Sequence, residues 1–116
     1  MINYDVEAVA DELLLTPEEL KEVFSLYFED TELLVTDCQA AMARTDYNEI
    51  NKVMHALKGA SLNLRMQSLG KLAADVEGLA KQKAEMALPA YLFRIKGEIA
   101  AIKTQISAFY VELEKT

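Results

Sequence analysis

Residues 91–113 read YLFRIKGEIAAIKTQISAFYVEL. Apolar side chains recur in this stretch at alternating spacings of three and four residues: Leu92, Ile95, Ile99, Ile102, Ile106, Phe109 and Leu113. Because an α-helix turns about 100° per residue, this spacing gathers all seven on one face. The stretch therefore predicts a long amphipathic helix. Pro89 falls in its first turn, where the missing N–H of proline costs nothing.

Two helices are predicted at the N-terminal end of the chain. A short one covers about residues 5–14, with Val6, Val9, Ala10 and Leu13 on one face. A second begins at Thr16 as N-cap and Pro17 as first helical residue, and ends near Arg44. Its expected inward positions are Leu20, Phe24, Tyr27, Thr31, Leu34, Cys38 and Ala41.

Two more helices are predicted in the middle of the chain. Asp46 is the N-cap of the first, with Glu49 at capping-box spacing, and this helix runs to about Leu64. The next covers about residues 66–83, with inward Met66, Leu69, Leu72, Val76, Leu79 and Ala80. Four long helices with short connections predict an all-α, antiparallel four-helix bundle, which the short N-terminal helix covers as a lid.

The composition suits one soluble globular domain, which we expect to cover residues 1–116. The chain is 52% hydrophobic with a formal net charge of -7. An acidic surface repels phosphate backbones, so nucleic acid is not an expected partner. No signal peptide or membrane span is visible, and the lone Cys38 cannot form an internal disulfide. We therefore expect a cytoplasmic monomer without membrane contact, and Met1 favours a free-standing protein.

The only histidine lies on the wrong face of its helix for a core residue. The apolar positions of that helix form one arc: Ile50, Val53, Met54, Leu57, Ala60 and Leu64. His55 points roughly 150° away from the centre of this arc. It therefore faces water or a partner molecule. A lone exposed histidine is often only a surface residue, so its neighbours must decide.

The neighbours of His55 suit phosphoryl chemistry. Neutral imidazole is a nucleophile near pH 7, since its unperturbed pKa is about 6.5. Lys52 and Lys58 stand three residues before and after it, where an ammonium group can reach a phosphoryl group on the ring. Gly59, one turn further on, costs about 1 kcal/mol relative to alanine in a helix interior. A glycine on an exposed face lets another backbone come close.

The segment His55-Ala56-Leu57-Lys58-Gly59-Ala60-Ser61, followed by Leu64 and Leu69, resembles the signature of histidine phosphotransfer (HPt) domains. The resemblance implies a histidine phosphorylated on Nε2. It also implies a lysine, here Lys58, that neutralises the phosphoryl group, and a glycine, here Gly59, that permits close docking. The family usually has glycine where this chain has Arg65, which puts the local turn geometry in doubt.

A further candidate residue follows from the expected antiparallel pairing. If the chain reverses near Met66, Glu77 lies opposite His55. Its carboxylate could accept the Nδ1 proton and leave Nε2 free to attack. The resemblance agrees, because the phosphotransfer domain of the chemotaxis kinase has a glutamate at the matching place.

The expected function is a phosphorelay carrier. The resemblance implies that phospho-His55 passes a phosphoryl group between a hybrid sensor kinase or a receiver domain and the receiver of a response regulator. The expected partner-binding residues are Asn51, Lys52, Lys58, Gly59 and Leu62. No cofactor or metal is expected on this chain, because the partner would hold the magnesium.

Other functions fit the sequence less well. The alternative is a helical interaction module, an adaptor that is not phosphorylated. A di-iron bundle would need Glu-x-x-His on two helices, and the chain has one histidine. Cys38 lies on an apolar stripe, which favours inert burial over catalysis. No phosphate-binding loop is present, so no independent kinase activity is expected.

Overall fold

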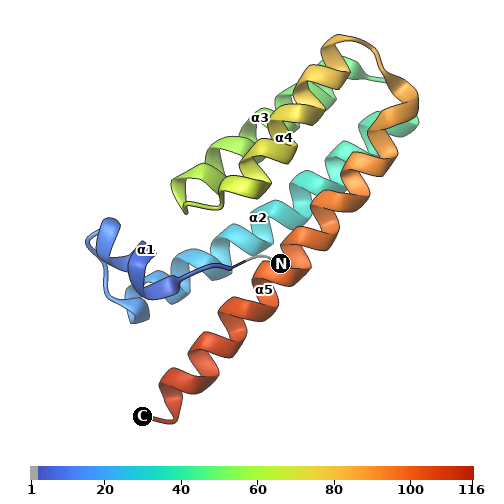
Figure 1. Cartoon of the computed structure of the whole chain (residues 1–116). Coiled ribbons are helices and arrows are strands. Elements are labelled where there is room, and N and C mark those ends of the chain that lie inside the picture. The colour runs from blue at the N-terminus through green and yellow to red at the C-terminus, as the bar shows by residue number, and fades with distance from the viewer. Residues whose placement is uncertain (1–2) are drawn as a thin grey trace.

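Helices make up almost all of the described chain, residues 3–116 of a computed structural model (Figure 1). The α-helices are α1 (Val6–Glu12), α2 (Pro17–Ala43), α3 (Tyr47–Asn63), α4 (Gln67–Lys81) and α5 (Leu88–Glu114). A 3₁₀ turn, η1 (Glu85–Ala87), leads into α5. The prediction of an all-α, antiparallel four-helix bundle with a short N-terminal lid helix is confirmed, and the helix boundaries differ from the expected ones by about two residues.

The N-termini of the first three helices are fixed by side-chain caps. The Thr16 hydroxyl accepts from the backbone N–H of Glu19, and the Glu19 carboxylate accepts from the N–H of Thr16, which completes a capping box. Asp46 accepts from the N–H of Glu49 and so begins α3, as the sequence predicts. Asp5 does the same for α1. These caps satisfy donors that the first turn leaves open.

The first four α-helices each end with a residue in the left-handed conformation that is not glycine: Leu14, Thr45, Arg65 and Lys83, with φ between 53° and 62°. At the end of α3, the N–H of Met66 donates to the Ser61 carbonyl and that of Arg65 to the Leu62 carbonyl, the pattern of a Schellman motif. Arg65 therefore adopts the backbone conformation that glycine would take with less strain. The closing turn of α3 therefore forms although this residue is not glycine.

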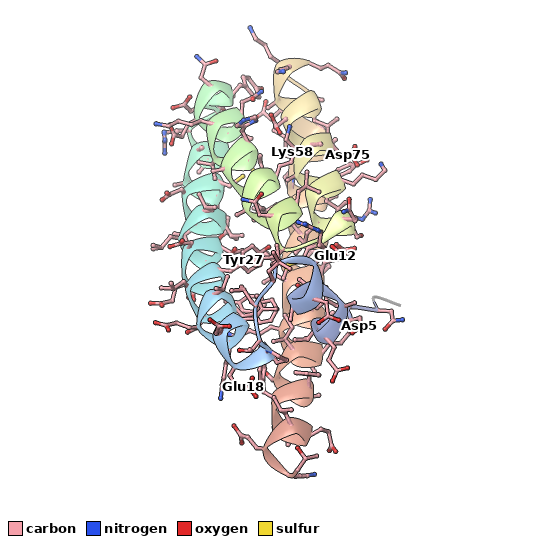
Figure 2. All side chains as sticks on the ribbon, turned by 90° about the vertical axis from the view of Figure 1, so that its left-hand side faces the viewer. Asp5, Glu12, Glu18, Tyr27, Lys58 and Asp75 are labelled. Carbon is pink, nitrogen blue, oxygen red and sulfur yellow. The ribbon has the colours of Figure 1, made fainter. Side chains whose placement is uncertain are left out.

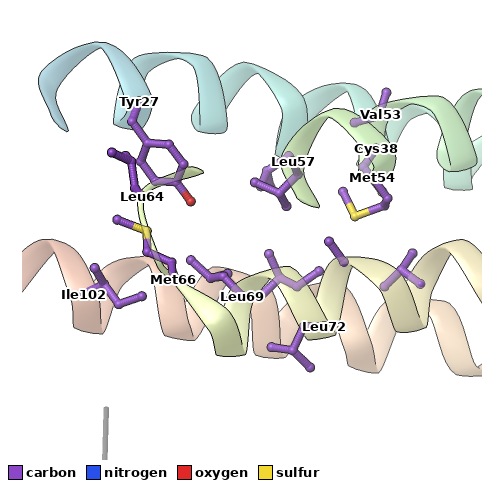
Figure 3. Packing of buried hydrophobic residues seen from close by; sticks show 14 of the residues in the cluster. Tyr27, Cys38, Val53, Met54, Leu57, Leu64, Met66, Leu69, Leu72 and Ile102 are labelled. Atoms are coloured by element: carbon purple, nitrogen blue, oxygen red, sulfur yellow. The ribbon is translucent and has the colours of Figure 1, made fainter. Parts of the chain in front are cut away.

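The core follows the expected stripes with a few shifts (Figure 3). On α2, Leu34 is only half-buried and Val35 is buried in its place. Val35 lies on the side of α2 that faces α5, where it lines the same surface pocket as Ile99. On α5, Tyr110 is buried, whereas Phe109 next to it is half-buried. A helical stripe is wide enough that periodicity alone does not decide between adjacent positions at its edge.

The bundle is uneven in length. Helices α2 and α5 have 27 residues each, whereas α3 and α4 have 17 and 15, so the α3–α4 hairpin covers only part of the longer pair. Helix α1 lies beyond the tip of this hairpin (Figures 1 and 2). The Tyr4 hydroxyl donates to the Leu64 carbonyl at 2.7 Å, and Arg65 Nε donates to Glu12 Oε2 at 2.7 Å. These two hydrogen bonds connect the N-terminal segment with the turn between α3 and α4. No helix within residues 3–116 is long and apolar enough to span a bilayer.

Candidate functional site

His55 lies in the middle of α3 with its ring on the outside of the bundle. Its side chain is 71% exposed. The ring nitrogen Nδ1 lies 3.3 Å from Oε2 of Glu77 on α4. The predicted pairing of these two residues across the turn at Met66 is therefore present in the structure. The Glu77 side chain is only 10% exposed, so it holds the ring from the buried side.

The contact with Glu77 decides which ring nitrogen faces outward. An ionised carboxylate can only accept hydrogen bonds, so a neutral ring in this contact carries its proton on Nδ1. Nε2 is then left with a free lone pair. Because Nδ1 is held on the Glu77 side, Nε2 is directed away from it toward solvent. The arrangement presents a nucleophilic nitrogen to an incoming molecule.

The side chain of Lys58 is less exposed than helical periodicity suggests. It occurs one turn after His55 on α3 (Figure 2). Its side chain is 30% exposed, and Nζ lies 3.0 Å from Oε1 of Glu77. This oxygen accepts no hydrogen bond of good geometry, so the contact is an ion pair. Helical periodicity alone would place Lys58 on the exposed face beside His55, but the buried Glu77 carboxylate draws its ammonium group inward. Glu77 thus holds His55 with one oxygen and Lys58 with the other.

The remaining predicted residues lie around this cluster in different ways. Asn51 is half-buried and its side-chain amide donates to the Glu77 carbonyl at 3.2 Å, so it ties α3 to α4. Lys52 is exposed, and within residues 3–116 no ion pair involves it. Gly59 is exposed, and a β-carbon there would meet nothing within 4 Å. Its presence is not required by packing inside the chain.

Leu62 of α3 is 37% exposed, and its side chain also contacts α4. Its side chain lies over Gly70 of α4, where an added β-carbon would collide with it. The sequence reasoning missed Gly70, although a glycine inside an amphipathic helix is itself a sign of close approach. This close contact sets how near α4 comes to the histidine helix.

A buried hydrogen bond below the site was also missed. The Tyr27 hydroxyl and Ser61 Oγ lie 2.7 Å apart, and Ser61 is fully buried. Burial raises the pKa of Tyr27, so the phenol stays neutral and available as a donor. This bond joins α2 to α3 and fixes the rotation of the helix that carries His55. Serine in a run of small residues gives no sequence signal for such a role.

The candidate site is therefore a surface cluster on two helices. Within the part of the chain that the structure describes, no three His, Cys, Asp or Glu side chains gather as metal ligands would. The chemistry that the cluster offers is that of an oriented, exposed imidazole next to a lysine. A charged group attached to Nε2 would have an ammonium group nearby to stabilise it.

Comparisons with known proteins point to one family. A search of curated proteins and a search of solved structures both found no match. The family model for the Hpt domain matches residues 22–108, which contain the whole four-helix bundle except the ends of α2 and α5. Hpt domains are histidine phosphotransfer modules of phosphorelays and act as phosphocarriers. With three quarters of its length matched, the chain belongs to the Hpt domain family.

Proposed function

We propose that His55 is the phosphorylated residue, and that this chain carries a phosphoryl group on Nε2 between partners of a two-component phosphorelay. The observation that carries the proposal is the contact of His55 Nδ1 with Glu77 Oε2 at 3.3 Å on a ring that is 71% exposed. It combines an accessible nitrogen with a fixed tautomer. His55 is also the only histidine of the chain.

The proposed transfer step needs no group beyond the two partners. The Nε2 lone pair attacks the phosphorus of an aspartyl phosphate, the N–P bond forms, and the acyl P–O bond breaks to release the partner's carboxylate. The ring keeps its proton on Nδ1 and becomes cationic. Glu77 stabilises that positive charge, and Lys58 stabilises the negative phosphoryl oxygens. Transfer to the next partner is the same step in reverse.

The proposed partners are receiver domains of response regulators and a hybrid sensor kinase. Gly59, Lys52 and Leu62 lie on the exposed part of α3 and would touch them, whereas Asn51 would act through Glu77. On this proposal, residues 1–116 are a single Hpt domain that works as a cytoplasmic monomer and has no independent kinase activity.

Replacement of the histidine tests the proposal. Incubation with phosphoramidate, and separately with a phosphorylated receiver domain, should give label that is labile in acid and stable in base. His55→Gln should abolish labelling by both donors and leave the helical circular dichroism unchanged. Label that persists in this variant would contradict the assignment of His55. A wild-type protein that takes no label from either donor would favour the adaptor function instead.

A further inference from the structure

The net charge of -7 is distributed unevenly along the chain. Residues 47–84, which form the α3–α4 hairpin and its flanking turn, contain six cationic residues and three carboxylates, a formal charge of +3. The rest of the chain contains six cationic residues and 16 carboxylates, a formal charge of -10. The surface is therefore not evenly acidic, and the segment that carries His55 has the opposite sign to the rest.

Half of the hairpin cations are neutralised by partners. Lys58 contacts Glu77, Arg65 contacts Glu12 and Lys71 contacts Asp75. The other three are exposed and, within residues 3–116, belong to no ion pair: Lys52, Lys81 and Lys83.

Two of these unpaired lysines lie close to the histidine in the register of the hairpin. Lys52 is about one turn before His55 on α3, and Lys81 is one turn after Glu77 on α4. Because His55 contacts Glu77 across two antiparallel helices, Lys52 and Lys81 lie on adjacent helices toward the same end. The unpaired positive charge thus spans both helices of the hairpin.

The neighbouring surface has the opposite charge. Helix α2 contains one lysine and seven carboxylates: Glu18, Glu19, Glu22, Glu29, Asp30, Glu32 and Asp37. Residues 5–12, around α1, add four more carboxylates. An acidic partner is therefore repelled from the α1–α2 side and attracted to the hairpin. Fields of this kind act over about 10 Å at 0.1 M salt and raise association rates by roughly 10- to 1,000-fold.

We propose that the receiver domain docks through an acidic surface laid across both α3 and α4, with Lys52 and Lys81 as its electrostatic anchors. This inference rests on the proposed function, and it adds the charge of the partner surface and the side from which it approaches. The positive charge of the hairpin favours an acidic partner surface, because opposite charges across an interface attract each other. The shape agrees, because β-carbons at Gly59 of α3 and Gly78 of α4 would both meet nothing within 4 Å. A flat partner surface can therefore come close to either helix.

The test measures phosphoryl transfer from phospho-His55 to a receiver domain that accepts it, at low and high salt. The second-order rate of the wild-type protein should fall at least about tenfold between 20 mM and 500 mM NaCl. Lys81→Glu and Lys52→Glu should each transfer at least about fivefold more slowly than wild type at 20 mM, with rates that converge at 500 mM. Circular dichroism checks that each variant folds.

The matched control is Lys96→Glu, which makes the same charge change at an exposed lysine of α5 that has no ion pair within residues 3–116. Its transfer rate should stay within about twofold of wild type. Phosphoramidate should label wild type, Lys81→Glu and Lys96→Glu equally. Loss of that labelling would count against His55 itself. If labelling is normal but transfer to the receiver does not depend on salt, the proposed docking surface is wrong while the assignment of His55 stands. The same conclusion follows if Lys96→Glu slows transfer as much as the hairpin variants do.

Discussion

At the scale of single residues, the site depends on one carboxylate that serves two neighbours. Glu77 contacts His55 through Oε2 and Lys58 through Oε1. Before phosphorylation, the lysine balances the charge of a largely buried acid. In the proposed phosphorylated state, the phosphoryl oxygens compete with Glu77 for the same ammonium group. On this proposal, Lys58 has a structural role in one state and a chemical role in the other, which sequence periodicity does not reveal.

Lys58→Ala should affect both stability and transfer. Removing the lysine leaves the Glu77 carboxylate without its counter-ion, so unfolding free energy should fall by about 1–2 kcal/mol. For a fully exposed lysine the change would stay within about 0.5 kcal/mol. Transfer should lose roughly 1.5–3 kcal/mol of stabilisation. Urea unfolding and the phosphohistidine half-life measure the two effects. Lys52→Ala is the stability control, and an unfolding midpoint for Lys58→Ala equal to that of the control would contradict the structural role.

Gly59 should show opposite effects on stability and on docking. Because a β-carbon there meets nothing, Gly59→Ala should raise the unfolding free energy by roughly 0.5–1 kcal/mol. Gly59→Gln should still fold, but its side chain would stand beside His55 and slow transfer to a receiver by up to about a hundredfold. Phosphoramidate, which is small, should still label it.

Gly97 of α5 is the matched control for Gly59, since a β-carbon there also meets nothing within 4 Å. Gly97→Gln should leave transfer unchanged. Equal rates for Gly59→Gln and wild type would show that close docking does not occur at this face. Failure with phosphoramidate as well would mean that the glycine serves the geometry of His55.

At the scale of the helices, beginnings were easier to predict than endings. Thr16 and Asp46 were recognisable as caps because their side chains form the capping bonds themselves. The ends depend on a backbone conformation at Leu14, Thr45 and Lys83, residue types that rarely adopt it. There, the backbone bonds of the closing turn outweigh the local preference. No residue type marks those ends in the sequence.

Thr45 should be the most strained of these endings, because its side chain is β-branched and its φ is 53°. Thr45→Gly removes the clash and should raise the unfolding free energy by about 1 kcal/mol. Thr104→Gly, at an exposed position inside α5, should lower it by several tenths of a kcal/mol. Urea midpoints for both variants provide the comparison. Destabilisation by both would show that Thr45 bears no strain.

At the scale of the whole molecule, the sequence predicted the bundle and the histidine pair better than the contacts around them. The stripe from Leu92 to Leu113 predicted the last helix of the bundle, and the turn at Met66 was enough to place Glu77 opposite His55. The Lys58–Glu77 ion pair and the Tyr27–Ser61 bond were not predicted, since each depends on how two helices are rotated about their axes. Periodicity gives the face of a helix but not its rotation to within one residue. The uneven charge also became meaningful only when helices were placed around His55.

The single cysteine offers a probe of how the bundle opens. Cys38 is fully buried between helices, and burial raises its pKa to about 11 (Figure 3). Both effects suppress the thiolate that reacts with disulfide reagents. In the native protein at pH 8, reaction with such a reagent should therefore be at least about a thousandfold slower than in urea-unfolded chain.

The urea dependence of this reaction distinguishes global from local opening. If Cys38 is reached only when the whole bundle unfolds, the logarithm of its reaction rate should rise with urea at the slope found from circular dichroism. A slope near zero would mean that α2 separates from its neighbours without global unfolding.

The Cys38 thiol should also make stability depend on pH. Because the folded state favours the neutral thiol, the contribution of Cys38 to stability is intact below the unfolded pKa of 9.0 and is lost as pH rises through about 11. Cys38→Ala should retain more of its stability at pH 11 than wild type does, and an identical alkaline loss in both would exclude the thiol as its source.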